Sequence, residues 1–412
     1  MKILTTIILM VTLSAFADLS PKVSKAEFYK LNNAAFEKQM MRQHKFRWND
    51  QSKTSARSFR ASSFLNMKVT EAIVEFGAPG IKKVSLYLYN RGDDGNIKQQ
   101  AFNDKVNEVR KALATFTKAQ ERKQTKTGAT KANSSYWLKS NVLYRLTYNG
   151  GPISKRGPWQ SEFIRLDLNF NEGNFVNSAT RLRSAAHVRK NVQNKDNGDV
   201  VIANVPMVDQ GQKGYCACAT TARVLQYFGR NVDQHEIAQL ALSTAGGGTN
   251  PDQLLNSLKK IRTKFNLNVS ELIHLDMRMI KKLARYYDKL AKKQNKPPMN
   301  LRYGYMAAFS GDRQLMLEAR SQMSDYDRFI KHVKNYVRQG VPLSWTLIVG
   351  IYKENKRIPQ AGGGHMRLII GYNEKTEEII FTDSWGRGHE VKRMGMKEAW
   401  AASTGLYLVK PR

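Results

Sequence analysis

The chain has 412 residues but only two cysteines, Cys216 and Cys218, two positions apart in the segment DQGQKGYCAC. Cysteines at this spacing in a helix point apart, and a single pair cannot build the disulfide framework that stabilises small exported folds. The chain must therefore fold by burying apolar side chains, for which its 41% hydrophobic content is sufficient. Its length predicts two domains of ordinary size.

The N-terminus predicts export. Lys2 precedes an apolar run from Ile3 to Leu13, and Ala15-Phe16-Ala17 matches a small-x-small cleavage site. We therefore assign residues 1–17 to a signal peptide and expect the mature protein in the periplasm, the cell envelope or the extracellular space. The apolar run is too short to span a bilayer, and no other run approaches ~20 residues, so we expect no membrane-spanning segment.

The charge is strongly positive. The chain carries 67 Lys plus Arg against 34 Asp plus Glu, a formal net charge of +33. Such a field attracts anionic partners, but the charges are spread over the whole chain and no nucleic-acid-binding motif organises them. For an exported protein, anionic envelope polymers or acidic protein substrates are the expected counterparts, and a solvated surface without a specific partner is the alternative.

Residues 18–195 predict a smaller α+β domain. Strand-like runs at 67–76 and 82–90 form a hairpin, a helix is expected over 102–119, a Lys/Thr-rich loop follows, and further strands fall within 134–149 and 162–170. His44 and His187 lie in basic, polar stretches and are expected at the surface. The polar, unpatterned segment from 183 to 199 predicts the boundary with a second domain, residues 196–412.

The segment around Cys216 has the pattern of a nucleophile site. Residues 216–228 predict a helix that ends at Gly229, which places Cys216 in the first turn, where the helix dipole favours a thiolate. Gly214 contributes to a turn-rich approach to this helix. Gln210 lies six residues before Cys216, so its side-chain amide and the Cys216 backbone N–H can point at one oxyanion.

Cys218 is the competing candidate. On a helix it shares a stripe with Thr221, Leu225 and Phe228, about 160° from Cys216. That stripe predicts a buried face. We therefore interpret Cys218 as a small core residue.

A base and its orienting group are predicted near the C-terminus. Two strand-like runs, HMRLIIGY and EEIIFTDS, flank a turn centred near residue 374, which sets His365 opposite position 383 or 384. Cross-strand neighbours are about 4.5 to 5.5 Å apart at Cβ, so Asp383 can orient the His365 imidazole. Trp385 is placed to cover the pair and limit access of water.

Other sites are weaker. His389 is the reserve base, close in sequence to Asp383 but beyond Trp385 and Gly386, whereas His235, His274 and His332 lack a carboxylate placed by a hairpin. A zinc site built on the two cysteines fails because they face apart on the helix and no Cys-x2-Cys or His-x3-His element exists. We therefore expect no metal and no cofactor.

The combination Gln210, Gly214-Tyr215-Cys216, His365 and Asp383-Ser384-Trp385-Gly386 resembles the papain-like cysteine peptidases over residues 200–412. Asp at position 383, where papain has Asn, is similar to the bacteriocin-processing peptidase-like branch. The resemblance implies a two-lobed α+β fold, with Cys216 on a helical lobe, His365 on an antiparallel β lobe and the active site between them. It also implies hydrolysis of peptide or isopeptide bonds through a thioester.

Three function classes stay open at this point: a cysteine peptidase acting on a protein or peptide substrate, a related acyltransferase or amidase, and a non-catalytic envelope-binding protein. The long separation between Cys216 and His365 is less typical of transglutaminases, which keep these residues closer. The first domain is either an inhibitory pro-region or a permanent binding domain, and its folded-domain patterning favours the second.

Overall fold

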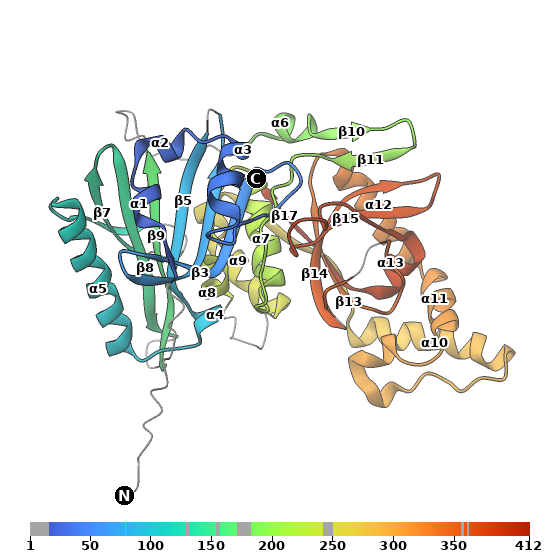
Figure 1. The fold of residues 1–412 in the computed structure, drawn as a ribbon. Helices are drawn as coiled ribbons and strands as arrows, with labels where there is room; N and C mark the ends of the chain where they lie inside the picture. The colour runs from blue at the N-terminus through green and yellow to red at the C-terminus, as the bar shows by residue number, and fades with distance from the viewer. Residues whose placement is uncertain are drawn as a thin grey trace, which may run out of the picture.

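The computed structural model describes residues 16–78, 80–127, 130, 132–153, 157–170, 183–241, 250–355, 358–360 and 362–412. It has a mixed α/β architecture in which two β-sheets lie side by side, one from the first half of the chain and one from the second (Figure 1). Most of the predicted signal peptide, residues 1–15, lies outside the described residues. Within the described ranges, no helix is both long and apolar enough to cross a bilayer.

The first sheet has the strand order β1-β3-β4-β5-β9-β8-β7-β6, with β2 paired to β3. Its strands are β1 Ala17–Asp18, β2 Arg47–Trp48, β3 Ser55–Phe64, β4 Met67–Phe76, β5 Ile81–Asn90, β6 Arg122–Thr127, β7 Ala132–Lys139, β8 Val142–Pro152 and β9 Trp159–Phe170. The accompanying helices are α1 Ser20–Val23, α2 Ala26–Tyr29, α3 Asn33–Phe36, the π-helix η1 Glu37–Met41, α4 Arg91–Asp94 and α5 Gln99–Thr117.

The two faces of this sheet differ in character. Helix α5 lies along one face (Figure 1), and its buried residues Phe102, Val106, Val109 and Leu113 recur at the helical period and join the first core. Alternate residues of a strand point to opposite faces. The residues that point away from this core include buried polar side chains, and these meet the second half of the chain.

Most of the expected elements of the first half are confirmed. The runs at 67–76 and 82–90 are β4 and β5, which pair antiparallel, and the expected helix is α5. Two expectations are wrong. The Lys/Thr-rich loop contains strand β6, which pairs with β7, and His44 is fully buried, with Nδ1 3.2 Å from Ser62 Oγ, because β3 covers it.

The second sheet has the order β10-β11-β14-β13-β17-β12, and β15 pairs with both β14 and β16. Its strands are β10 Val192–Asn194, β11 Asp199–Ile202, β12 Leu267–His274, β13 Leu343–Val349, β14 Gly363–Asn373, β15 Glu378–Thr382, β16 Lys392–Gly395 and β17 Ser403–Pro411. The helices are α6 Ala185–Arg189, α7 Cys216–Tyr227, α8 Gln234–Leu240, α9 Pro251–Phe265, α10 Met277–Lys293, the 3-10 helix η2 Leu301–Phe309, α11 Arg313–Ser321, α12 Ser324–Arg338 and α13 Met396–Ala402.

Helix α7 lies between the two sheets (Figure 1) and packs against β14. It ends as predicted, with Gly229 at a φ of 86° just beyond its last turn. Helices α10 and α11 project away from the sheets together with η2 and have a small core of their own. The second core, around α7, α12 and the second sheet, surrounds the region where the predicted site residues lie.

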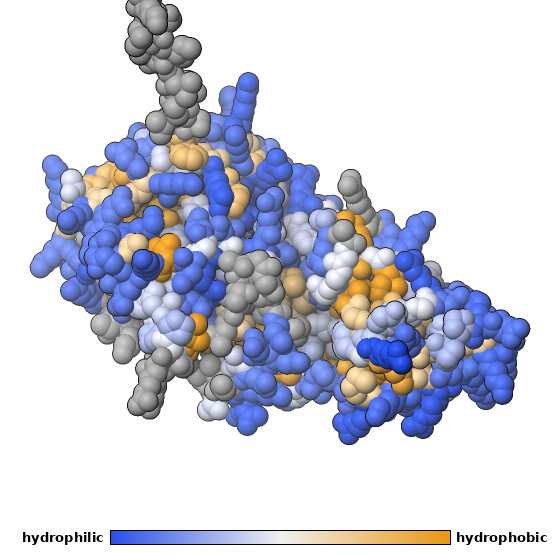
Figure 2. Space-filling model, turned by 90° about the horizontal axis from the view of Figure 1, so that it is seen from below, coloured by the Kyte–Doolittle hydropathy of each residue, from blue (hydrophilic) through white to orange (hydrophobic). Residues whose placement is uncertain are grey.

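The segment from 183 to 199, predicted as an unpatterned boundary, contains α6 and β10. Strand β10 pairs with β11, which pairs with β14, so the second sheet begins inside this segment. The division into domains at residue 196 stays a prediction. Seen from below, the surface is mostly hydrophilic with a few separate hydrophobic patches (Figure 2), in keeping with the net charge of +33.

Candidate active site

Cys216 is the first residue of helix α7 and is partly exposed. At this position its backbone N–H has no acceptor within the helix and stays available to a ligand. The approach to the helix is a tight turn in which Tyr215 N donates to Lys213 O at 2.7 Å, with Gly214 between them. The helix N-terminus therefore presents both the thiol and an N–H donor, the arrangement that favours a thiolate.

Cys218 is fully buried in the second core. Its neighbours on the predicted stripe, Thr221, Leu225 and Phe228, are also buried. The expectation that Cys218 is a core residue is confirmed.

His365 and Asp383 are brought together at one end of the antiparallel strands β14 and β15. His365 is the third residue of β14, Asp383 follows the last residue of β15, and Nε2 of the imidazole lies 2.8 Å from Oδ1 of the carboxylate. Both side chains are buried. Because Nε2 is bound to Asp383, Nδ1 is the ring nitrogen left for the thiol of Cys216.

The strand register that joins them differs from the predicted one. The turn spans residues 374–377, and a β-bulge follows Ile369, so Leu368 pairs with Thr382. This register, continued past the end of β15, sets Arg367 opposite Asp383 and His365 opposite Trp385. The expectation that His365 lies directly opposite Asp383 or Ser384 is therefore wrong, and the two side chains meet along a diagonal.

Trp385 stacks on the imidazole. The ring centroids of His365 and Trp385 are 4.2 Å apart and the ring planes are 12° from parallel. The rings of Trp385 and His389 meet edge to face, with centroids 5.5 Å apart and planes at 79°, and the backbone N of Asp383 donates to the backbone O of His389 at 3.0 Å. His389 is thus separated from the pair by the indole.

The carboxylate of Asp383 lies in a cluster of buried charges. Arg367 Nε is 2.9 Å from Oδ1, and Lys392 Nζ is 2.9 Å from Oδ2. Both cations also pair with Glu354, at 2.8 Å for Arg367 Nη2 and at closer range for Lys392. Two carboxylates are thus balanced by two cations, as burial of ionised groups requires.

The protonation equilibria follow from these contacts. Burial opposes ionisation of Cys216, but the interaction with His365 outweighs it, and the pKa of the thiol lies below its usual value. Burial disfavours imidazolium at His365, but Asp383 and Cys216 outweigh it and raise its pKa. Burial also opposes ionisation of Asp383, while Arg367, His365 and Lys392 hold its pKa below the usual range. The three groups together favour a thiolate beside an imidazolium.

Gln210 is bound to the residue after Asp383. Its backbone N donates to Ser384 O at 2.8 Å, and its side-chain Oε1 accepts from Ser384 Oγ at 2.7 Å. With the carbonyl end of the amide fixed in this way, Nε2 is the end that remains to donate, and it lies 3.4 Å from Lys213 O. Gln210 therefore presents an N–H donor from the loop that leads into helix α7.

Several residues of the site were missed in the sequence. Arg223, fully buried on helix α7, donates to the backbone O of Asp383 at 2.7 Å and to Thr382 Oγ1 at 2.7 Å. Burial lowers the pKa of this guanidinium to about 10, against the opposing effect of the Asp383 charge. Arg367 shares a face of β14 with His365, two positions away, and this alternation was the available signal. Lys392 and Glu354 carry no such signal.

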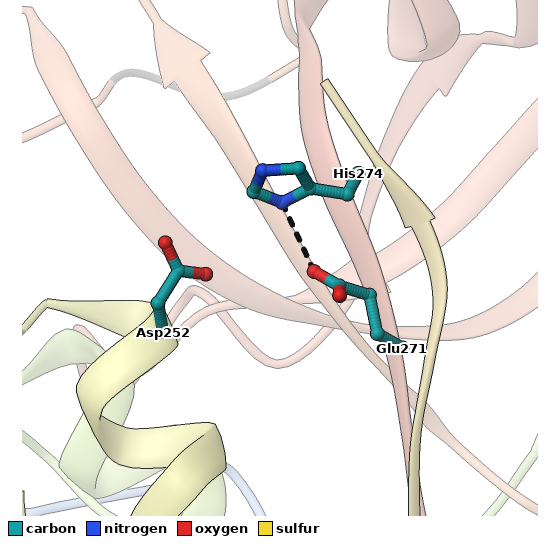
Figure 3. Close-up of side chains that lie close together, drawn as sticks. All are labelled: Asp252, Glu271 and His274. Carbon is teal, nitrogen blue, oxygen red and sulfur yellow. Dashed lines mark ion pairs between the residues drawn. The ribbon is translucent and has the colours of Figure 1, made fainter. Parts of the chain in front are cut away.

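A second group of titratable side chains lies elsewhere. Asp252, Glu271 and His274 approach one another at the surface (Figure 3), and His274 Nδ1 pairs with Glu271 Oε1 at 2.9 Å. All three are exposed, and Asp252 is in the first turn of α9, where a carboxylate stabilises the helix dipole. This cluster has an ordinary electrostatic explanation.

Comparison with known proteins identifies the class. The model of the Peptidase_C39 like family matches residues 202–407, half of the chain, and the match spans Gln210, Cys216, His365 and Asp383. The chain belongs to this family. It is a cysteine peptidase, as the resemblance to papain-like enzymes and their bacteriocin-processing peptidase-like branch predicted.

Among solved structures, the peptidase is similar to xylellain, a cysteine protease from Xylella fastidiosa, at 15% identity and a TM-score of 0.30. The match covers 58% of this chain and 94% of that one. No curated protein sequence matches. The assignment rests on the family model.

Proposed function

We propose that the peptidase hydrolyses peptide or isopeptide bonds with a Cys216–His365–Asp383 triad. The observation that carries the proposal is the partly exposed thiol at the start of α7, with lowered pKa, beside an imidazole whose Nε2 is fixed 2.8 Å from Asp383. A nucleophile, a base and a group that orients the base are the requirements of this chemistry.

In the proposed mechanism, the Cys216 thiolate attacks the substrate carbonyl carbon and forms a C–S bond. The oxyanion of the tetrahedral intermediate accepts hydrogen bonds from Gln210 Nε2 and the Cys216 backbone N–H. As the C–N bond breaks, the His365 imidazolium donates its proton to the leaving amine. A water molecule, deprotonated by His365, then hydrolyses the thioester and restores the thiol.

Asp383 and Trp385 support His365 in this scheme. Asp383 fixes the ring orientation and stabilises imidazolium, and the stacked indole of Trp385 shields one face of the ring from water. Gly214 shapes the approach to the helix. The chemistry assigned to these residues requires no metal or cofactor.

The experiment that tests the proposal is digestion of a mixed peptide library by the chain from Asp18, with fragments read by mass spectrometry. Cys216→Ala should lower cleavage by about 10³-fold or more, whereas the matched variant Cys218→Ala, two residues away, should cleave normally. The proposal is wrong if Cys216→Ala cleaves the peptides as fast as the unaltered chain, or if the unaltered chain cleaves none of them. Products joined to an added amine in place of a free carboxylate would indicate acyl transfer.

We further propose that residues 196–412 form a two-lobed peptidase domain and that residues 18–195, apart from α6 and β10, which join the second core and sheet, form a separate α+β domain. In support, α7, α8 and α9 lie to one side of β13, β14 and β15 (Figure 1), His365 is on β14, and each half of the chain has its own core. Limited proteolysis tests this division. If it is correct, cleavage between β9 and β10 should leave two stable fragments, each with one sheet.

Export of the chain is also proposed, on the N-terminal pattern. Cleavage after Ala17 would leave Leu19, a fully buried core residue, in the mature chain. The first residue of the mature protein, determined by N-terminal sequencing of the secreted fraction, should be Asp18, and a mature protein that begins at Met1 would contradict the assignment. The full chain has a net charge of +33, of which only Lys2 belongs to the signal peptide, so we expect anionic envelope polymers to retain the exported chain and salt to release it.

A further inference from the structure

A row of polar side chains crosses the face of the first sheet that points away from α5. In the strand register, Glu71 on β4 lies opposite Tyr87 on β5, and Tyr87 lies opposite Arg165 on β9. Register partners lie on the same face, so these three side chains form a continuous row. None of the three belongs to the apolar core on the other face.

This row meets the second half of the chain. Lys213 Nζ lies 3.1 Å from Glu71 Oε2 and 2.5 Å from Asp93 Oδ2, on helix α4. The Tyr87 hydroxyl donates a hydrogen bond to the Asp233 carboxylate, and Arg165 Nη1 lies 3.7 Å from Glu236 Oε1. The first sheet is thus bound both to the loop that precedes α7 and to α8.

Lys213 is the centre of this contact. Its side chain is 1% exposed, and those of Glu71 and Asp93 are 0% and 4% exposed. An ammonium group removed from water needs paired anions, and both of these anions come from the first half of the chain. The position of Lys213 therefore depends on the first sheet.

The loop is held at its other end as well. Arg57 on β3 pairs with Glu71 at 2.5 Å and with Asp209 at 3.4 Å. The fit is close in both places: a Cβ added to Gly211 would lie 2.6 Å from Arg57 Nη2, and one added to Gly92 would lie 2.6 Å from Tyr215 Cζ. The loop from Asp209 to Tyr215 cannot shift without disturbing the sheet.

The same loop carries Gln210. Its Nε2 donates to the backbone O of Lys213 at 3.4 Å, and its Oε1 is bound to Ser384. The position of the Lys213 carbonyl therefore helps to orient the side-chain amide of Gln210, which donates a hydrogen bond to the oxyanion in the proposed mechanism. A chain of contacts joins Glu71 and Asp93 through Lys213 to Gln210.

We propose that Lys213 is a positioning residue through which the first sheet holds Gln210 in place for the oxyanion, so that the N-terminal half is a permanent part of the active site and not a removable pro-region. This inference rests on the proposed function. It assigns Glu71 and Asp93 a role in catalysis although they lie in the other half of the chain.

The test compares Lys213→Met and Asp93→Asn with the unaltered chain. Asp93→Asn keeps the shape of the side chain and the buried Lys213–Glu71 pair, so it serves if Lys213→Met does not fold. Asn149→Ala is the matched control, because Asn149 Nδ2 bonds Gln239 Oε1 at 2.9 Å across the same interface without touching the loop. Each variant is measured for peptide hydrolysis, for alkylation of Cys216 by iodoacetamide and for amide hydrogen exchange over residues 209–216.

We expect Lys213→Met to lower kcat by about 10² -fold, the effect of losing one oxyanion donor, and Asp93→Asn to lower it by about tenfold, with little change in KM. The alkylation rate should stay the same, because displacement of iodide from a saturated carbon develops no oxyanion. Amide exchange over the loop should be faster in both variants and unchanged in Asn149→Ala.

An unchanged kcat in both variants overturns the inference, as does a parallel fall in hydrolysis and alkylation, which would indicate general damage to the site. An equal loss in Asn149→Ala overturns it too. Failure of the proposed function looks different, because Cys216→Ala would then cleave as well as the unaltered chain. In that case amide exchange still decides whether Lys213 holds the loop, and unchanged exchange in both variants refutes it.

Discussion

Arg367 Nε lies 2.9 Å from Asp383 Oδ1, the same oxygen that lies 2.8 Å from His365 Nε2. The carboxylate therefore serves two cationic partners on one oxygen, and Lys392 on the other. In a simple Cys-His-Asp arrangement the full negative charge acts on the imidazole. Here Arg367 and Lys392 balance part of the negative charge of Asp383. Glu354 pairs with the same two cations, so the two carboxylates and the two cations together are neutral.

Asp383→Asn is expected to be far more damaging here than the presence of Asn in papain suggests. With a neutral amide at position 383, Glu354 is the single carboxylate left to pair with Arg367 and Lys392. One of these two buried cations is then uncompensated. Breaking a buried pair in this way costs about 3–5 kcal/mol, and the excess positive charge lowers the pKa of His365. Denaturant unfolding and the pH dependence of kcat/KM check both effects.

The control for this prediction is the double variant Asp383→Asn with Lys392→Met. It removes one negative and one positive charge, so the cluster is again neutral. We expect it to recover at least half of the lost stability. If the double variant is as unstable as the single one, charge balance is not what holds the cluster together.

The pH dependence of Cys216 reactivity follows from its partners. The pKa of Cys216 is lowered and that of His365 is raised, and both shifts favour the thiolate–imidazolium pair. Activity falls on the acid side as the thiol takes a proton and on the alkaline side as the imidazolium loses one. Iodoacetamide should alkylate Cys216 at pH 6 faster than a free thiol with a pKa of about 8.5. An ordinary thiol titration curve would contradict this.

Cys218→Ala should separate packing from chemistry. The side chain is fully buried in the second core, so loss of its sulfur leaves a small cavity and lowers the free energy of unfolding by about 1 kcal/mol. Hydrolysis by the folded variant should be unchanged. Denaturant unfolding and peptide hydrolysis, measured on the same preparation, check the two halves of this prediction.

The sequence was sufficient for the local features of the site. A glycine after the helix, an apolar stripe and a cysteine at the first turn predicted α7 and the burial of Cys218, because these depend on helix geometry alone. The strands β4 and β5 were recognisable as alternating or β-rich runs, and β14 and β15 as strand-like runs on either side of a turn. The approach of His365 to Asp383 was anticipated for the right reason, a hairpin, but with the wrong register, because the bulge between Ile369 and Gly371 was not taken into account.

What could not be predicted depends on contacts between distant segments. Glu71 is one of three charged residues in the strand MKVTEAIVEF, and nothing local shows that it is the one that meets Lys213. His44, in a basic stretch, was expected at the surface and is buried under β3. Such residues are buried because their partners lie across the fold, which sequence patterns do not record.

Trp385 should affect the base rather than substrate binding. Its ring stacks on His365 at 4.2 Å, so Trp385→Ala opens that face of the imidazole to water and loosens its orientation toward Cys216. We expect kcat to fall by about tenfold with a small change in KM, whereas Trp385→Phe, which keeps an aromatic face, should retain most activity. Equal losses in the two variants would argue against a stacking role.

The interface of the two halves predicts how stability depends on pH. Burial of Glu71 opposes its ionisation, but Arg57 and Lys213 hold its pKa well below the usual range. A carboxyl with a depressed pKa in the folded state contributes stability above its unfolded pKa, about 4.3, and this contribution is lost as the pH falls toward the folded value. Glu71→Gln should therefore be less stable than the unaltered chain at pH 7, and the difference should narrow below about pH 4. Denaturant midpoints at pH 7, 5 and 3 test this, with the exposed Glu27→Gln as control, and a difference for Glu71→Gln that is constant with pH would show that the ionised carboxylate does not stabilise the interface.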